Sequence, residues 1–250
     1  MIDGQQGNTK EPIEDSDVDL AVFVSYVRLD CPGNRGETFD LTFELRVHAP
    51  HHNTKHVDLF GNGQEGTILS FVDVPTQPGV DTVAFLEATE GLIKMFDLLG
   101  NSAFVVVQND MNGNVKKIRT RYEAFPEQSK TLEDLVKHES TEKKRTATEG
   151  LLWLLRGLKF TQIALSRSQA NKTEELNASF DAAYTNTLKP YHSFVVKPIF
   201  VLAMKACPYR KDFYAKLGPP GSDVDGQLLA WLNALEKSIT QLEAFYAAGN

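Results

Sequence analysis

Hydrophobic residues change their spacing along this chain, and the change divides it into two parts. Before residue 70 the clearest pattern is alternation, in which apolar and polar side chains take turns from Leu41 to Val47. A period of two is typical of a β-strand with one buried face. A run rich in β-branched and aromatic residues, Val18 to Leu29, precedes it, and Pro32 lies in the turn-forming stretch between them. This pattern predicts a hairpin, with loop or disorder over 1–16 and 50–68.

After about residue 79 the apolar residues recur every three or four positions, which is the period of an α-helix. Gly100 is a natural end for the first helix, and Pro198 is expected to kink or unwind the sixth. The pattern predicts an all-α body of about 180 residues. Its predicted helices cover about 79–99, about 102–122, a segment capped by Ser129 or Thr131, a segment opened by Thr146 or Thr148 that runs to about Ser168, 173–188, 191–206, 210–217 and 224–247.

Charge divides the chain at the same place. Residues 1–69 hold 12 Asp and Glu against 5 Lys and Arg, whereas residues 70–250 hold 21 of each. Proteins that bind nucleic acid need an excess of Lys and Arg to neutralise phosphates. The neutral body therefore argues against a nucleic-acid partner.

The composition also limits the compartment. No apolar run reaches the roughly 18–20 residues that a membrane span needs, and the polar, acidic start is neither a signal peptide nor an Arg-rich transit peptide. The two cysteines, Cys31 and Cys207, do not make a disulfide framework. We expect a cytoplasmic chain with reduced thiols.

Two patterns before residue 70 are typical of ligand sites but lack the context that such sites require. Gly61, Gly63 and Gly66 form G-x-G-x-x-G, yet no helix opens at the third glycine, so a flexible loop is the better interpretation. Four histidines crowd into nine positions without a supporting cysteine pair or a credible helix. We expect no cofactor and no metal; the four histidines are His48, His51, His52 and His56.

A polar stripe is the first candidate for chemistry. Asp110, Asn114 and Lys117 are spaced i, i+4 and i+7, so on a helix they share one face. A carboxylate, an amide and an ammonium together supply the acceptors and donors that a polyhydroxylated ligand such as a sugar requires. The alternative is a solvated helix surface with an internal salt bridge.

Two aromatic side chains are further candidates. Trp153 lies in LLWLLRGLKF, where it is either a core residue or a flat platform for the apolar face of a sugar ring. His192 lies in LKPYHSF, where it is either a structural histidine or a hydrogen-bonding partner for a buried amide.

Taken together and in this order, these residues resemble the glycolipid transfer protein family, and most closely its fungal heterokaryon-incompatibility branch. The similarity covers roughly residues 70–248. Its joint motif is D-x-x-x-N-x-x-K, then W-L-x-R-G-L, then Y-H-x-[FW]. The matching blocks are FLEATEGLIKMFDLLG, DMNGNVKKI, ATEGLLWLLRGLKF, YHSFVVKPIF and ACPYRKDFYAKLG.

The resemblance implies roles for individual residues. Asp110, Asn114 and Lys117 match the positions that hydrogen-bond the sugar, with Asp110 also sharing the amide N–H of the lipid. Trp153 matches the tryptophan on which the first sugar stacks, and His192 matches the histidine that bonds the amide carbonyl. Further residues match an apolar pocket for the lipid chains and a contact with the membrane. The pocket positions are Phe96, Phe104, Phe160, Leu188 and Phe200, and the membrane position is Phe194. Tyr209 is a second expected membrane contact, because aromatic side chains favour the membrane interface.

The resemblance also implies a fold and a function. The expected fold is a two-layer all-α sandwich of about eight helices over 70–250, behind a short β-like or disordered extension over 1–69. The expected function is the binding of a neutral glycosphingolipid and its transfer between membranes, by a monomer that touches membranes transiently. Carriers of ceramide-1-phosphate in the same superfamily have basic residues at the positions of Asn114 and Trp153, so a neutral sugar is favoured.

Three alternatives remain open on the sequence. The same site can serve a glycolipid sensor or signalling adaptor, with the acidic extension as its partner-binding element, or a ceramide-1-phosphate carrier. An enzyme is disfavoured, since a glycosidase wants two facing carboxylates and no G-x-S-x-G motif is present for an esterase. Residues 1–69 have no assigned role, and a misassigned start or a retained intron is one explanation for their different pattern.

Overall fold

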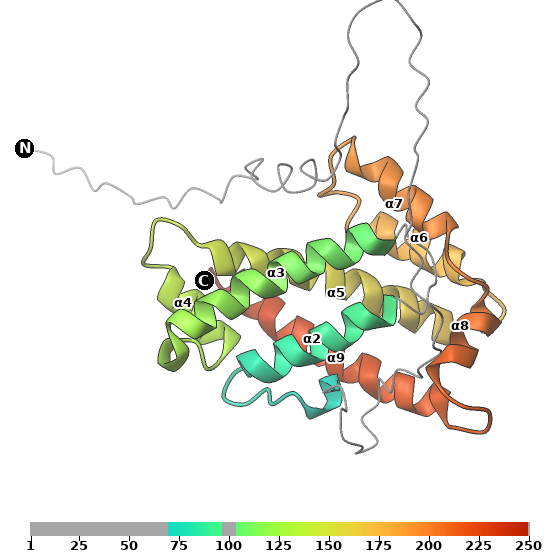
Figure 1. The fold of residues 1–250 in the computed structure, drawn as a ribbon, viewed down its shortest axis with the longest axis horizontal. Coiled ribbons are helices and arrows are strands. Elements are labelled where there is room, and N and C mark those ends of the chain that lie inside the picture. The colour runs from blue at the N-terminus through green and yellow to red at the C-terminus, as the bar shows by residue number, and fades with distance from the viewer. Residues whose placement is uncertain (1–69, 97–103, 250) are drawn as a thin grey trace, which may run out of the picture. The chain divides into compact units, whose positions relative to one another are not determined.

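The computed structural model describes residues 70–96 and 104–249 (Figure 1). In this part of the chain there are eight α-helices and no strands, which confirms the all-α prediction. The helices are α2 (Thr82–Met95), α3 (Val105–Ala124), α4 (Leu132–Glu139), α5 (Thr146–Ala170), α6 (Leu176–Asn186), α7 (Val196–Lys205), α8 (Arg210–Leu217) and α9 (Val224–Ala247), with 3₁₀ helices η1 (Phe71–Asp73) and η4 (Pro126–Gln128). The predicted hairpin, the glycine motif, the four clustered histidines and Gly100 lie outside the described residues.

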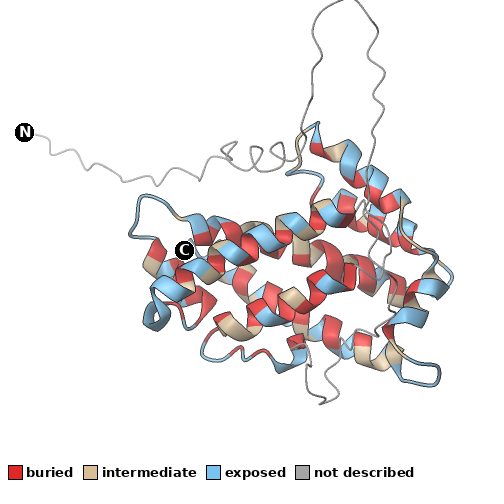
Figure 2. Cartoon of the chain, viewed as in Figure 1, coloured by how far each residue is buried: buried red, intermediate tan, exposed pale blue. Residues whose placement is uncertain are grey.

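Helix α5 is the centre of the fold. It packs against α3, α4, α6 and α9, and α2 packs in turn against α3. Figure 1 shows α2 and α3 crossing in front of α5 and α9, in keeping with a sandwich of two helical layers. Buried positions line the sides of the helices that face one another (Figure 2). The apolar spacing that predicts these helices in the sequence is therefore the spacing of their core faces.

Side chains that accept hydrogen bonds from free backbone N–H groups determine where several helices begin. Thr131 precedes α4 and accepts from the N–H of Asp134 at 3.1 Å, as one of the two predicted caps. Helix α5 begins at Thr146, one of the two predicted starts, and its N-cap residue Arg145 makes no side-chain cap hydrogen bond. Instead Glu139, the last residue of α4, accepts from the N–H groups of Ala147 at 3.0 Å and Thr148 at 2.6 Å. The two helices are thereby joined at a buried carboxylate.

A second buried carboxylate ties separate segments to α4. Glu133 accepts from the N–H of Val80 at 2.9 Å and from the side-chain amide of Gln241, on α9, at 2.8 Å. The segment before α2, the start of α4 and the end of α9 therefore meet at one side chain.

The predicted kink at Pro198 is wrong, because helix α7 begins at Val196 rather than near 191. Pro198 is the third residue of the helix, and an N–H at that position has no partner within the helix. The proline therefore fits without disturbing the hydrogen bonds. The preceding residues form turns instead, with the N–H of His192 bonded to the carbonyl of Leu188 at 3.2 Å.

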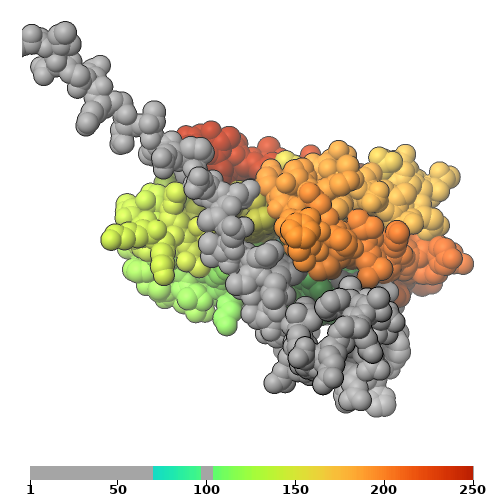
Figure 3. Space-filling model, turned by 90° about the horizontal axis from the view of Figure 1, so that it is seen from above, coloured from blue at the N-terminus to red at the C-terminus, as the bar shows by residue number. Residues whose placement is uncertain are grey.

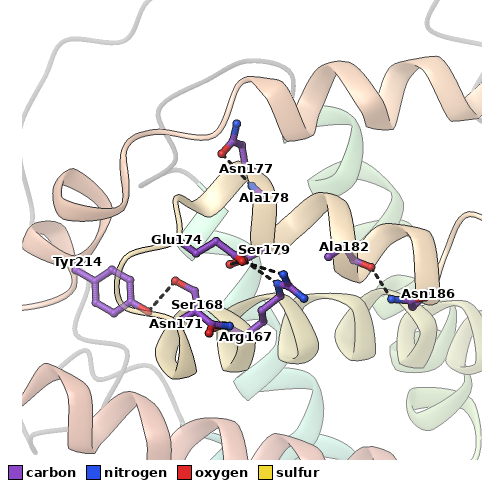
Figure 4. Close-up of polar contacts among 10 residues, drawn as sticks. All are labelled: Arg167, Ser168, Asn171, Glu174, Asn177, Ala178, Ser179, Ala182, Asn186 and Tyr214. Carbon is purple, nitrogen blue, oxygen red and sulfur yellow. Dashed lines mark hydrogen bonds and ion pairs between the residues drawn. The ribbon is translucent and has the colours of Figure 1, made fainter.

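The turn between α5 and α6 is fixed by polar contacts (Figure 4). Arg167 forms a two-bond ion pair with Glu174, at 2.7 and 2.8 Å, and the hydroxyl of Ser179 donates to the same carboxylate at 2.7 Å. Helix α8 joins this end of the molecule through Tyr214, whose hydroxyl lies 3.2 Å from that of Ser168.

Candidate functional site

The polar stripe of α3 lies against α5. Asn114 is buried, with 2% of its surface exposed, and its side-chain oxygen Oδ1 accepts from the ammonium of Lys117 at 3.2 Å. The two helices approach closely here because Gly150 has no side chain. A β-carbon at Gly150 would lie 3.1 Å from Cδ of Lys117 and 3.4 Å from the backbone carbonyl oxygen of Asn114. The structure therefore places two of the three stripe residues together, one helical turn from Trp153.

The third stripe residue, Asp110, lies one helical turn before Asn114 and is half-buried. Its neighbour Met111 meets α5 at Gly157. Between Asp110 and Lys117 on the same face, Gly113 is exposed, and a β-carbon there would have no atom within 4 Å in the described residues. The stripe therefore combines a buried side chain, Asn114, with unfilled space around the exposed Gly113.

Trp153 is held by a cation and a second aromatic ring. The guanidinium of Arg156 lies 4.5 Å from the centre of the Trp153 ring and 3.8 Å from that of Tyr191. The two rings meet edge to face, with their centres 6.5 Å apart. These contacts connect α5 to the turn that carries His192, and so bring the tryptophan and histidine candidates into one region.

His192 lies in an apolar, aromatic environment. Its ring centre is 4.3 Å from that of Phe200, and its Nδ1 is 3.2 Å from the hydroxyl of Tyr184. Burial lowers the pKa of His192 from 6.5 to about 4, and the positive charges of Lys197 and Arg156 act in the same direction. The imidazole is therefore neutral at pH 7 and carries a single N–H.

The five predicted pocket side chains are all buried, with no more than 5% of their surface exposed. The four aromatic side chains among them belong to two separate groups in the described residues. Phe96 and Phe104 have their ring centres 6.0 Å apart. Phe160 and Phe200 both contact Tyr184, at 6.5 and 5.3 Å, and Leu188 is the buried residue at the turn that follows. The predicted pocket residues are therefore part of the buried apolar core of the described residues.

The two predicted membrane residues lie at the surface. Phe194 is 84% exposed and Tyr209 is 70% exposed. Between them along the chain, α7 presents a shallow apolar hollow of about 500 Å³. Figure 3 shows α7, in orange, on the outside of the molecule. The hollow is lined by Phe194, Lys197, Pro198, Val201, Leu202 and Lys205.

Within 70–96 and 104–249, no three His, Cys, Asp or Glu side chains cluster as metal ligands. None of the helices in those ranges is both long and apolar enough to cross a bilayer.

A second hollow, of about 380 Å³, lies between α5 and α9. The ion pair of Lys159 with Glu243 occupies its wall, at 2.7 Å.

Sequence reasoning missed three residues that the structure places in this region. Arg156 and Tyr191 stand inside the quoted motifs, as the arginine of WLLRGL and the tyrosine that precedes His192. Those motifs were a usable signal for both. Tyr184 lies eight residues before His192, on α6 rather than in the turn that carries His192, and no short pattern connects them.

Comparison with known proteins identifies the family of this chain. The family model described as Glycolipid transfer protein (GLTP) matches residues 80–219. A glycolipid transfer protein of Aureobasidium melanogenum is 52% identical over 180 residues, which cover 72% of this chain and 90% of that protein.

Two solved structures are similar in fold and sequence. HET-C2, a fungal glycolipid transfer protein, is 54% identical with a TM-score of 0.68, over 70% of this chain and 92% of that one. FAPP2, described as selecting simple glycosphingolipids with the GLTP fold, is 30% identical with a TM-score of 0.68, over 76% of this chain and 95% of that one. On these matches, the chain belongs to the glycolipid transfer protein family.

Proposed function

We propose that this protein binds a neutral glycosphingolipid and transfers it between membranes. One observation carries the proposal more than any other. The bonded pair of Asn114 and Lys117 lies against Gly150 of α5, one helical turn from the Trp153 ring. A buried amide, an ammonium and an indole in one place form a site for a ligand that has both hydroxyl groups and an apolar face.

Hydrogen bonding would give this site its selectivity. Asn114 is buried, so a ligand that cannot bond to its amide leaves a polar group unpaired. Such a loss costs about 1–3 kcal/mol for each group. The site therefore favours lipids that carry sugar hydroxyls over lipids that lack them, with Asp110 and Lys117 as further partners.

The lipid chains explain why a carrier is needed at all. A two-chain sphingolipid buries on the order of 30 methylene groups, and exposing each to water costs about 0.8 kcal/mol, or roughly 24 kcal/mol in total. A protein that replaces bilayer contacts with contacts to buried aromatic and aliphatic residues removes most of that barrier. The gain on entry nearly cancels the loss on leaving the bilayer, so binding stays reversible.

Vesicle transfer of a fluorescent glucosylceramide, with ceramide-1-phosphate as a second cargo, tests the proposal. The wild-type protein is expected to transfer the glycolipid and not the phosphate lipid. Asp110→Val removes a carboxylate of the stripe and should abolish transfer without unfolding the protein. Asn112→Val, an exposed change on α3 outside the stripe, is the matched control and should transfer normally.

The outcomes separate the candidate functions. Preferred transfer of ceramide-1-phosphate would establish the phosphate carrier instead, which a site with Asn114 and Trp153 in place of basic residues does not favour. Normal transfer by Asp110→Val would contradict the assigned site. Release of free ceramide from the glycolipid would identify an enzyme rather than a carrier.

A sensor or signalling adaptor would use the same site without moving lipid in the cell. It is the second candidate, because residues 1–69 carry a net charge of −7 and have no role in the carrier. A pull-down with the full chain and with residues 1–69 removed would detect a partner that depends on them.

We place the carrier in the cytoplasm, as a monomer.

A further inference from the structure

The hydroxyl of Tyr184 lies in an apolar environment with one polar neighbour. Tyr184 is 1% exposed, its ring is stacked on Phe200 at 5.3 Å, and it meets Phe160 edge to face at 6.5 Å. Its hydroxyl lies 3.2 Å from Nδ1 of His192, and the described residues give it no other hydrogen bond. Burial raises the pKa of Tyr184, so the hydroxyl keeps its hydrogen.

This arrangement decides which nitrogen of His192 carries the hydrogen. If Nδ1 carried it, that group would donate to the tyrosine oxygen, and the hydroxyl hydrogen of Tyr184 would point into an aromatic cluster without an acceptor. An unpaired buried donor is costly. If the hydroxyl donates to Nδ1, the buried hydroxyl hydrogen has an acceptor, and the imidazole hydrogen lies on Nε2 of a side chain that is only half-buried.

We propose that Tyr184 is a positioning residue that fixes His192 in the tautomer with its hydrogen on Nε2. This inference rests on the proposed function, in which His192 bonds the amide carbonyl of the lipid. A carbonyl oxygen only accepts hydrogen bonds, so a bare Nε2 would repel it and an Nε2–H attracts it. Tyr184 thereby makes the site specific for a lipid that presents a carbonyl oxygen at this point.

The tautomer can be measured without any substitution. In the full-length protein labelled with ¹⁵N-histidine, two-bond ¹H–¹⁵N spectra at pH 7 distinguish the two neutral tautomers of an imidazole. The signals of His192 are assigned by their loss in His192→Gln. We expect the pattern of a hydrogen on Nε2, and the pattern of a hydrogen on Nδ1 would overturn the inference outright.

Tyr184→Phe tests the cause. It keeps the ring packing and removes only the hydroxyl, so we expect a mixture of tautomers and a fall in glucosylceramide transfer of about tenfold, the effect of one hydrogen bond. Tyr214→Phe is the matched control, since it removes a hydroxyl that also lies 3.2 Å from its partner, Ser168 (Figure 4). Ser168 is 15 residues beyond Trp153 on α5, a separation of about 22 Å along the helix.

The two variants separate positioning from general stability. Both should lose a similar, small amount of stability, but only Tyr184→Phe should change the tautomer and the transfer rate. Equal transfer by the two variants, or an unchanged tautomer in Tyr184→Phe, would overturn the inference. Failure of the wild-type protein to transfer glycolipid would instead contradict the proposed function.

Discussion

The junction of α4 with α5 and the surface of α7 use polar and apolar side chains in opposite ways. At the junction a carboxylate is buried: Glu139 is 3% exposed and accepts three hydrogen bonds, from the N–H groups of Ala147 and Thr148 and from the hydroxyl of Thr148. On α7 and beside it, large apolar side chains are exposed, including Phe194 at 84% and Leu202 at 63%.

The difference separates a part of the molecule that stabilises the fold from a surface that we propose makes contact with a membrane. A buried charge is tolerated when its oxygens are hydrogen-bonded, and a helix N-terminus is a favourable place for it. Exposed apolar side chains contribute nothing to the stability of the isolated protein and mark an interaction surface when they are grouped. Lys197 and Lys205 flank the α7 hollow, a combination that suits an apolar interface with an anionic lipid surface.

Replacing Glu139 tests the folding half of this comparison and has the largest expected effect. Glu139→Ala should lower the free energy of unfolding by about 3 kcal/mol, because the first N–H groups of α5 lose their acceptor inside the protein. Urea denaturation measures the loss. If the alanine variant does not fold, Glu139→Gln, which keeps one acceptor oxygen, should be intermediate.

Asp134, an exposed carboxylate on the same helix, supplies the control. Asp134→Ala should change the free energy of unfolding by less than about 0.5 kcal/mol. Equal losses of unfolding free energy at the two positions would show that the buried carboxylate stabilises the protein no more than an exposed one.

Changing the α7 surface tests the contact half. The double variant Phe194→Ser, Leu202→Ser should transfer glucosylceramide about tenfold more slowly, because it loses apolar area that would enter the membrane interface. Its free energy of unfolding should stay within about 0.5 kcal/mol of wild type. Liposome flotation measures the loss of binding directly, and unchanged flotation would mean that this surface serves another partner.

The pH dependence of stability is a further test, because His192 is half-buried and lies between the core and the surface. The pKa of about 4 in the folded state lies below the ordinary value of 6.5, so the unfolded chain binds the proton first as the pH falls. The stabilising effect is present in full above about pH 6.5 and is lost as the pH falls toward 4. Since the group is partly exposed, the expected loss is on the order of 1 kcal/mol.

Thermal unfolding of the wild type and of His192→Gln between pH 7 and pH 4.5 checks this expectation. The variant should lose less stability than the wild type over the same interval. Identical pH dependence in the two proteins would show that His192 titrates normally. The charged and titratable groups around the imidazole are Tyr184, Lys197 and Arg156.

Replacing Gly113 has the smallest expected effect, and it should change stability and glycolipid transfer in opposite directions. Gly113→Ala should raise the free energy of unfolding by about 0.5–1 kcal/mol, because glycine is a poor residue in the middle of a helix and the β-carbon meets no atom of the described residues. Glycolipid transfer should nevertheless slow, since the methyl group enters the open space between Asp110 and Lys117.

Asn112→Ala, also exposed on α3, is the control for helix propensity and should stabilise without slowing transfer. Gly113→Leu should slow transfer further. Faster or unchanged transfer in both Gly113 variants would place the sugar elsewhere.

The sequence predicted the helices best where local signals agreed. Helix α9 covers the predicted 224–247 and α8 the predicted 210–217, since apolar spacing and flanking Pro and Gly coincide there. Thr131 caps α4 as one of two predicted candidates. Helix α5 begins at Thr146, one of two predicted candidates, but the carboxylate that accepts from its first N–H groups comes from Glu139 of the preceding helix, which no local pattern predicts. The start of α7 was wrong because the residues before Val196 form turns, although the apolar run already begins at Phe194.

By itself, the sequence determined the all-α body and the residue types that a glycolipid site requires, since helical period and side-chain chemistry are properties of short segments. Only the tertiary structure decided how those residues meet. Gly150 brings Asn114 and Lys117 against α5, and Arg156 joins Trp153 to Tyr191. Tyr184 reaches His192 across a turn between two helices. Such contacts depend on how helices pack, and packing is the sum of many small interactions that no single motif contains.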